Sequence, residues 1–453
     1  MDNSEKYKLI ADGEISLASD MAVIPKSKDF SFDAEFIKVA LNEAKDFKLL
    51  SFKNGSAEDE SLNAEEVFTA EIQYESDTFV VELSVFKNEI LNLDDFGFGN
   101  VIDKESLEIA KAQPFHLNVH MYFNDNALSS FHLQLKILHA IVPDAALCID
   151  FMPYRLLSAR WLAMTAKSQT PPSPDYLYTI HAVYEESNGE KVYWFHTHGL
   201  HRCGLVDVEM VNIKQGAQEM HTLLNMIAKK MLADPAQEKE RFTIGYDGMG
   251  IDICWLRWEE ALTDFPRDVL GGLNERVEAD NIHAEPVGVV FAVEDGNMIS
   301  PEIYAKTLAE NPIFYITNEE TDRMSALAKE RFYMFKQVFE SKQNPKRKSF
   351  LNQLFGIKSK GKERNDGWLF IVKLGLNVDE PQSASEREHL WFEVKGIDSD
   401  NNIEGKLMNQ PYWISGLKEG DVQTYPVDLL TDFLIYGPDS TYSSDTIYEL
   451  GFE

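Results

Sequence analysis

The spacing of apolar residues in the first third of the chain switches between the helical period and the strand period. Apolar residues three and four positions apart predict helices over residues 31–47, 129–142 and 153–168. Strict alternation predicts a hairpin over 68–86 and a strand over 115–123. Helices interleaved with hairpins are typical of an α+β fold, in which antiparallel sheets carry helices packed on one face.

These periods also place individual side chains. At the first helix, Ser31 is expected to be the N-cap, and Phe32, Phe36 and Val39 are expected to share the apolar face. In the strand over 115–123, His116 and His120 alternate with the apolar residues. Successive side chains of a strand point to opposite faces, so we expect both histidines to be solvated.

The clearest local pattern covers residues 176–213. Two alternating runs flank Asn188 and Gly189, and Asn-Gly between such runs is the strongest short-range signal of a hairpin. A third strand completes the segment, and an amphipathic helix is predicted over 214–233. A second α+β segment follows and ends in a long helix over 317–340.

The chain of 453 residues is too long for one hydrophobic core, because single cores stop growing near ~250–300 residues. We expect an N-terminal α+β domain over 1–235 and a middle α+β domain over 236–341. A basic linker over 342–364 then leads to a small β-rich module over 365–453. The linker either docks on its own acidic domains or forms a short amphipathic anchor for an acidic partner or membrane face.

Composition narrows the function classes. The formal net charge is −32, from 43 Lys+Arg and 75 Asp+Glu, so nucleic acid is not an expected partner. The three cysteines do not make a disulfide framework. The N-terminus has no signal-peptide pattern, and no apolar run reaches the ~20 residues of a membrane span. Together these features predict a cytoplasmic protein, and they leave its oligomeric state open.

The C-terminal module contains a set of residues that we recognise as a motif: His389, Trp391, Gly405, Leu407, Asn409, Pro411, Gly420, Asp421 and Asp432. This set resembles the YegJ-like domain of bacteria, a domain of unknown function. Phe433 stands where that family often has Trp after the Asp. The resemblance implies a domain type and a bacterial origin, and it implies no activity.

The N-terminal part contains a second resemblance. The strand over 22–25, which reads Ala-Val-Ile-Pro, and the segment over 196–209 are similar to uncharacterised bacterial proteins found near polymorphic-toxin and immunity loci.

One cluster has residue types that bind metals: His196, His198, His201 and Cys203. On a strand, residues two apart share a face, and Gly199 would turn the chain back toward the first two histidines. Imidazole and thiolate are ligands that Zn²⁺ favours, and Asp207 or Glu209 would be a candidate base. The alternative is structural, because histidines at the end of a hairpin also hydrogen-bond to turn backbones.

Two functions therefore remain open. The first is a non-enzymatic interaction protein or immunity-type accessory factor, without a cofactor, whose acidic surface binds a basic protein. The second is a metal-dependent hydrolase that uses the His196, His198, His201 and Cys203 cluster with zinc. No motif assigns a catalytic residue or a bound organic cofactor.

Overall fold

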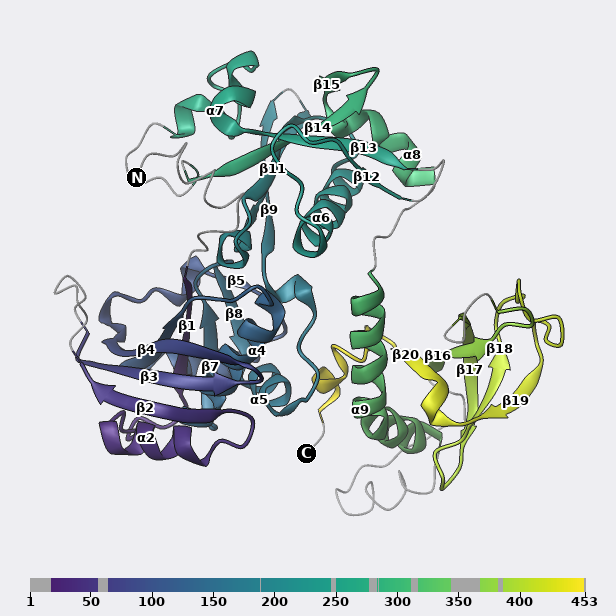
Figure 1. Ribbon diagram of the computed structural model, residues 1–453, viewed down its shortest axis with the longest axis horizontal. Coiled ribbons are helices and arrows are strands. Elements are labelled where there is room, and N and C mark those ends of the chain that lie inside the picture. The colour runs from purple at the N-terminus through teal and green to yellow at the C-terminus, as the bar shows by residue number, and fades with distance from the viewer. Residues whose placement is uncertain are drawn as a thin grey trace. The chain divides into compact units, whose positions relative to one another are not determined.

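The computed structural model describes residues 18–55, 64–187, 189–245, 250–276, 283, 285–310, 317–343, 367–381 and 386–451. The chain divides into two compact units. Unit 1 comprises Met1–Lys167 and Pro171–Ile316, and unit 2 comprises Ser168–Thr170 and Thr317–Glu453. Figure 1 labels the elements of both units.

The first part of unit 1 is an eight-stranded sheet. Its strands, in spatial order, are β2 (Lys48–Asn54), β3 (Glu66–Tyr74), β4 (Asp77–Lys87), β6 (Phe115–Met121), β1 (Ser19–Pro25), β7 (Ala145–Asp150), β8 (Arg155–Ser158) and β5 (Gly97–Phe98). Neighbouring strands are antiparallel except β5 and β8, which are parallel. The central strand β1 is almost entirely buried, because helices cover it.

Four helices pack on this sheet: α2 (Ala34–Glu43), α3 (Lys104–Lys111), α4 (Ala127–Ile141) and α5 (Ala159–Lys167). Helix α4 contacts β1 and β6, and α5 contacts β7 and β8. Helix α4 also buries polar side chains, which find backbone partners. The amide of Gln134 donates to the carbonyls of Ser19 and Val119 at 2.9 and 2.8 Å, which fixes the helix against both strands.

The second part of unit 1 is a seven-stranded sheet. Its main path is β12 (Phe242–Ile244), β13 (Ile251–Arg257), β14 (Val287–Glu294), β11 (Asp207–Ile213), β10 (Glu190–His198) and β9 (Thr179–Ser187). The remaining strand, β15 (Asn297–Ile299), pairs with β14. Helix α6 (Ala217–Ala233) packs on β9, β10 and β11, while the shorter helices are α7 (Trp258–Ala261) and α8 (Ala305–Glu310). Strands β11 and β14 run parallel, and the other pairs are antiparallel.

A buried ion pair joins the two sheets of unit 1. The guanidinium of Arg202 donates to both carboxylate oxygens of Asp150 at 2.9 Å. It also donates to the carbonyl of Leu177 and to the hydroxyl of Ser19. Both charged side chains are 0% exposed, so the pair is fully desolvated. The end of β7 is thereby tied to the short helix that follows β10.

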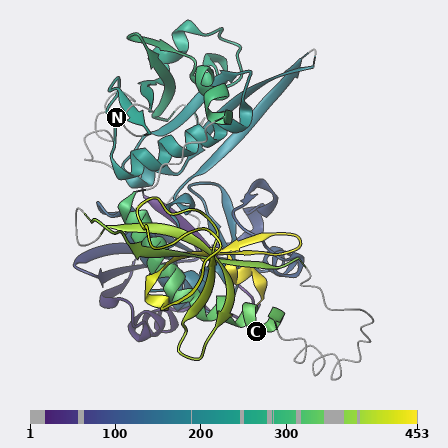
Figure 2. The same cartoon turned by 90° about the vertical axis from the view of Figure 1, so that its right-hand side faces the viewer.

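Unit 2 is a helix packed on a six-stranded antiparallel sheet. Helix α9 (Asn318–Gln343) contacts β20, and Phe335 lies 4.9 Å from the ring of Phe433. Figure 2 turns this sheet toward the viewer. The strands are β19 (Val422–Tyr425), β18 (Ile403–Leu407), β17 (Arg387–Ile397), β16 (Leu369–Asn377), β20 (Leu430–Tyr436) and β21 (Thr441–Ser443).

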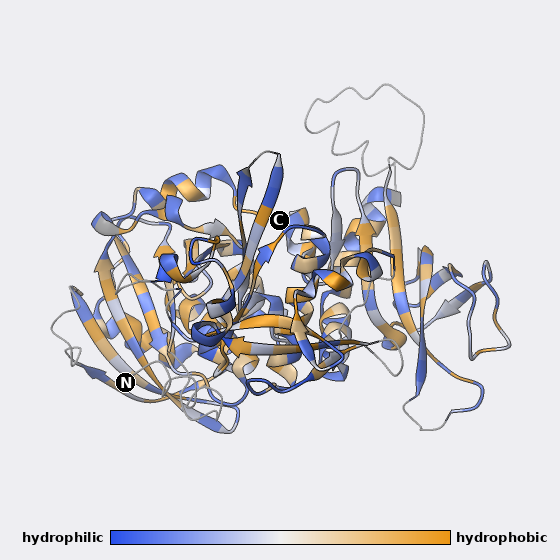
Figure 3. Ribbon diagram, turned by 90° about the horizontal axis from the view of Figure 1, so that it is seen from above, coloured by the Kyte–Doolittle hydropathy of each residue, from blue (hydrophilic) through white to orange (hydrophobic). Residues whose placement is uncertain are grey.

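The α+β class with mainly antiparallel sheets and a β-rich C-terminal sheet is confirmed. Figure 3 shows apolar residues along the strands and along the helices that pack on them. The hairpin over 68–86 corresponds to β3 and β4, and the predicted helix over 214–233 corresponds to α6. The hairpin around Gly189 joins β9 to β10, while Asn188 lies outside the described residues.

Two expectations for the first helix are wrong. Asp33, not Ser31, caps α2, because its carboxylate accepts the N–H of Phe36 at 2.9 Å. The buried residues of α2 are Ile37 and Leu41, and the Phe36 side chain is 40% exposed. The cap lies two residues after Ser31 and the helix begins at Ala34, and the buried positions of the helix start at Ile37, one position later than Phe36. Val39 is likewise exposed.

Two further expectations are corrected by long-range pairing. His116 is buried, and its Nδ1 makes a 2.6 Å hydrogen bond with the Asn88 side chain. His120 is partly exposed and lies beside Asp20. The segment predicted as a helix over 153–168 begins as strand β8, which pairs with β7 before α5 starts. A short apolar run is compatible with either a strand or a buried helix, and here pairing with the neighbouring strand β7 makes residues 155–158 a strand.

The expected domain boundary between residues 235 and 236 stays a prediction. The seven-stranded sheet takes strands from both sides of that position. The expected linker over 342–364 starts inside α9, and its residues after 343 lie outside the described ranges. In the part of the chain that is described, no helix is both long enough and apolar enough to span a membrane.

We expect Arg202→Met to lower the free energy of unfolding by about 3–5 kcal/mol, because it leaves the Asp150 carboxylate buried without its cation. The matched control is Asp94→Asn, which breaks a pair with Lys111 whose side chains are 34% and 68% exposed. That change should cost less than about 1 kcal/mol. Urea unfolding followed by tryptophan fluorescence measures both, and equal losses would contradict a special role for the buried pair.

Candidate metal centre

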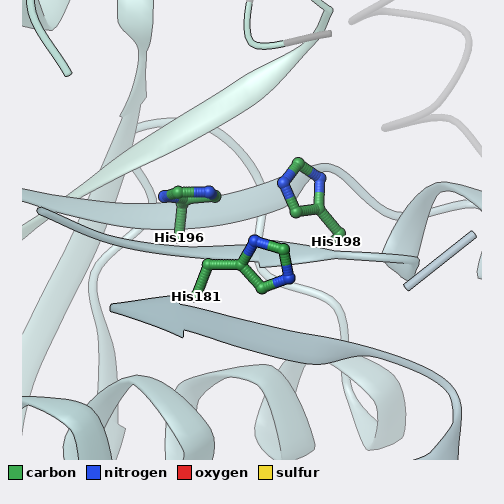
Figure 4. A group of neighbouring side chains, drawn as sticks. All are labelled: His181, His196 and His198. Atoms are coloured by element: carbon green, nitrogen blue, oxygen red, sulfur yellow. The ribbon is translucent and has the colours of Figure 1, made fainter. Parts of the chain in front are cut away.

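Three histidines converge on the hairpin of β9 and β10. His196 and His198 are two residues apart on β10 and therefore share a face, and His181 on β9 pairs directly with His196. One ring nitrogen from each residue can be chosen so that all three lie within 4.8 Å of one another. Figure 4 shows the three imidazoles gathered over the two strands. Three imidazole nitrogens at this spacing can bind one transition-metal ion.

Burial keeps these imidazoles neutral. The side chains of His196 and His198 are 3% and 9% exposed. Desolvation, with a smaller contribution from the neighbouring histidines, lowers the pKa of His198 to about 3 and that of His196 further still. Burial also lowers the pKa of His181. A metal requires unprotonated imidazole, so the three side chains are in their ligand form at neutral pH.

One nitrogen of the cluster has no hydrogen bond. Nδ1 of His196 is buried, and no partner for it exists among the described residues. Buried polar atoms are nearly always paired, and an unpaired one in a native protein requires an explanation such as an ion or water. A bound metal at this nitrogen would supply the missing partner.

The ring of His196 packs against Trp194, whose indole is held in turn by the Glu209–Arg276 ion pair. The indole of Trp194 lies 4.1 Å from the imidazole, and its Nε1 donates to Glu209 at 2.9 Å. Arg276 donates to both oxygens of Glu209 at 2.7 Å. The side chains of Glu209 and Arg276 are 1% exposed. Glu209 is therefore fully engaged and is not the free base that its position in the sequence suggested.

A close backbone approach completes this support. Gly271 has a φ of +74°, and a Cβ there would lie 2.6 Å from the Trp194 ring. Only glycine leaves room for the indole, and the Gly271 carbonyl accepts a hydrogen bond from Arg276.

The structure places His201 apart from the three-histidine group. Nε2 of His201 lies 2.7 Å from the Pro286 carbonyl, and Nδ1 lies 3.7 Å from the Asp207 carboxylate. Asp207 in turn accepts hydrogen bonds from the Thr197 hydroxyl at 2.7 Å and from the Leu200 N–H. His201 and Asp207 thus form a structural network beneath the hairpin end.

Cys203 also lies outside the group. It ends the short helix Leu200–Cys203, which follows the turn at Gly199. Gly199 has a φ of +114°, and a Cβ there would lie 2.6 Å from the Leu177 carbonyl. Burial raises the pKa of the Cys203 thiol to about 12, so the thiol stays protonated. The predicted ligand set therefore contributes His196 and His198 to the group, and the role of the other two stays a prediction.

The sequence contained a signal for His181. A two-residue loop at 188–189 pairs residue 187 with 190 and therefore pairs 181 with 196, which is the observed register. His283 gave no such signal. Its ring lies 4.8 Å from that of His196 and 5.4 Å from that of His198, and it comes from a segment 85 residues further along the chain.

A cavity of about 160 Å³ opens beside the histidines. Its lining includes His196, His198 and His283. The turn over 151–154 also lines the cavity, and the rings of Tyr154 and His198 contact each other with 5.4 Å between their centroids. The three acidic side chains in the lining are Asp207, Glu209 and Glu285.

Three family models match this chain. Residues 19–172 match the N-terminal model of the "Protein of unknown function (DUF4026)", and residues 180–291 match its C-terminal model. Residues 326–451 match the "Uncharacterized protein conserved in bacteria (DUF2314)". The chain carries both parts of DUF4026 and a DUF2314 domain. The two DUF4026 matches correspond to the two sheets of unit 1, and all three converging histidines lie in the second match.

The DUF2314 match covers most of the segment that resembles a YegJ-like domain, so an uncharacterised bacterial domain at that place is confirmed. The name YegJ is not part of the matched description. Searches among curated proteins and among solved structures gave no match.

We expect all three cysteines to be unreactive in the folded protein. Burial raises the thiol pKa of Cys148, Cys203 and Cys254, and only the thiolate reacts quickly. Titration with Ellman's reagent should proceed at least ~100-fold more slowly in native protein than in urea. Rapid reaction of one native thiol, lost in Cys203→Ser, would show instead that Cys203 is an activated ligand or nucleophile.

Proposed function

We propose that this protein binds one transition-metal ion through His181, His196 and His198. The observation that carries the proposal is the convergence of three neutral imidazoles, of which His196 and His198 are buried and His181 is partly buried, with an unpaired buried nitrogen on His196. Burying one unpaired polar nitrogen costs about 1–3 kcal/mol, which a metal ligand bond would offset. The donor set is all nitrogen, which suits Zn²⁺ and Co²⁺ and does not require the Cys203 thiol.

The metal would stabilise the hairpin that carries it. The ligands lie on β9 and β10, which are paired by hydrogen bonds. An ion bound to both strands would therefore cross-link them. An ion that binds only the folded protein raises its stability by mass action. Removing the metal should therefore loosen the second sheet of unit 1.

Purified protein without a His tag should bind about one equivalent of Zn²⁺ or Co²⁺, measured by elemental analysis and by the visible spectrum of the Co²⁺ form. His181→Gln and His198→Gln should each weaken binding at least about tenfold, because each removes one ligand.

Two control variants separate this ligand set from the set suggested by the sequence. Cys203→Ser and His221→Gln should bind metal as the wild type does, since neither side chain belongs to the three-histidine group. Loss of binding in Cys203→Ser with normal binding in His181→Gln would favour the sequence-based ligands. Binding below roughly a tenth of an equivalent in the wild type, with unchanged melting after chelation, would overturn the metal centre.

A second candidate function rests on charge. We propose that the protein is a cytoplasmic interaction protein or immunity-type accessory factor, and that its C-terminal domain is YegJ-like. The net charge of −32 supports fast association with a basic protein, and the motif around His389 and Trp391 supports the domain type. This function is compatible with a metal centre that holds the second sheet in shape.

The charge makes a prediction about salt. A basic protein captured by this chain from cells of its source should be released as NaCl rises from about 0.05 to 0.5 M, because exposed charges are screened over that range. The measurement is pull-down at both salt concentrations with lysozyme as a control for nonspecific basic binding. Recovery of no specific protein at low salt, or binding that salt leaves unchanged, would count against an electrostatic partner.

A further inference from the structure

A fourth histidine lies beside the three-histidine group. The centroid of the His283 ring is 4.8 Å from that of His196 and 5.4 Å from that of His198. The distances inside the three-histidine group are of the same size. The ring of His181 is 5.4 Å from that of His196 and 4.8 Å from that of His198, which are themselves 4.9 Å apart. Five of the six pairs among the four rings are therefore 4.8 to 5.4 Å apart.

The spacing of these rings matches the spacing around one shared ion. Structural zinc sites have four protein ligands in a tetrahedral arrangement, and Zn²⁺ binds an imidazole nitrogen at about 2.0 Å. Four imidazoles at that bond length have ring centroids about 5 Å from one another. The rings of His181, His196, His198 and His283 are thus close to the separations that a single tetrahedral ion requires.

A buried network positions His283 relative to His196. The carbonyl of His283 accepts a hydrogen bond from the Arg276 guanidinium at 2.8 Å. The same guanidinium pairs with Glu209, which also accepts the indole N–H of Trp194. The Trp194 ring in turn contacts both histidines, with 4.1 Å to the ring of His196 and 4.7 Å to that of His283. The approach of the two imidazoles is therefore held by the same side chains.

The imidazole of His283 is also in the form that binds metals. Burial lowers its pKa to about 4, with smaller contributions from Arg276 and His181, so the ring is neutral at pH 7. A ligand imidazole uses one ring nitrogen for the ion, and the other nitrogen commonly donates a hydrogen bond to its surroundings. His283 can therefore bind an ion and keep a hydrogen bond at the same time.

We propose that His283 is the fourth ligand of the metal ion, so that four imidazoles enclose the ion in a structural site. The proposal rests on the metal centre proposed above and adds a ligand and a role to it. Nitrogens of His181, His196 and His198 already lie within 4.8 Å of one another, and His283 completes the set by turning its ring toward them. The χ2 torsion of a histidine has a broad energy minimum, so this rotation costs little.

The ion would join three segments of the second sheet of unit 1. His181 lies on β9, His196 and His198 lie on β10, and His283 precedes β14. In the sheet, β11 separates β10 from β14, so the ion links segments that no direct strand pairing connects. With four protein ligands no position is left for water or substrate, and the ion therefore stabilises the fold of this sheet.

The first test needs no variant. Full-length protein without a His tag is loaded with one equivalent of Co²⁺, and its visible spectrum is recorded with and without azide. Four nitrogen ligands should give the intense bands of tetrahedral Co²⁺, and azide should leave these bands unchanged because no position is open. Bands that shift on addition of azide would overturn the fourth ligand and leave the three-histidine centre in place.

The second test removes the proposed ligand. His283→Ala should lower the affinity for Zn²⁺ at least about tenfold, measured by competition with a chromogenic chelator. Azide should now shift the Co²⁺ bands, and free imidazole should restore the wild-type bands. Imidazole can reach the vacated position, because His283 lines the cavity of about 160 Å³ and a cavity of about 150 Å³ in another protein admits benzene. The matched control His221→Ala removes an exposed histidine on α6 and should keep the wild-type affinity and spectrum.

The outcomes separate this inference from the proposed metal centre. Absence of Zn²⁺ and Co²⁺ binding in the wild type would overturn both. Wild-type affinity and an azide-insensitive spectrum in His283→Ala would overturn the fourth ligand alone. His283→Gln, which keeps more of the side-chain volume, is measured in parallel, and the azide experiment on the wild type decides the coordination number even if both variants unfold.

Discussion

The structure of unit 1 depends on the buried pair of Arg202 and Asp150. Asp150 ends β7 and directly precedes the turn over 151–154, while Arg202 lies in the short helix that follows His198. Two fully buried charges are tolerable only because each is satisfied by the other and by nearby carbonyl and hydroxyl oxygens. The pair therefore ties the turn over 151–154 to the segment that follows His198, and both segments line the cavity.

The buried carboxylates near the histidines are also paired with hydrogen-bond donors. Arg276 and Trp194 occupy the oxygens of Glu209, and Thr197 and Leu200 occupy Asp207. With its buried carboxylates already paired, the cavity keeps neutral imidazoles as its available donors. Among the described residues that line the cavity, only His196 keeps a buried side-chain nitrogen without a hydrogen bond, and this nitrogen is the observation that supports the proposed metal centre.

Unit 2 has a core of its own, in which α9 packs on β20 through Phe335 and Phe433. The half-buried pairing of Arg323 with Glu320 and Asp445 fastens the helix to the C-terminal segment. The DUF2314 match over residues 326–451 lies in unit 2, whereas the two sheets of unit 1 carry the DUF4026 matches.

The sequence by itself determined the features that depend on local periodicity. Alternation placed His196 and His198 on one face, and the two-residue loop of the hairpin already implied the pairing of His181 with His196. The strong periods of α6 and α9 and the strands of the C-terminal sheet were predictable for the same reason, since neighbours in sequence set the backbone geometry.

Only the tertiary structure decided which polar side chains are buried and what they contact. His116 pairs with Asn88, His201 pairs with the carbonyl of Pro286, and Arg202 pairs with Asp150. These partners are 28 to 85 residues apart, and no local pattern encodes such distances. Packing of the two sheets brought them together, and the cost of leaving a buried polar group unpaired selected those partners.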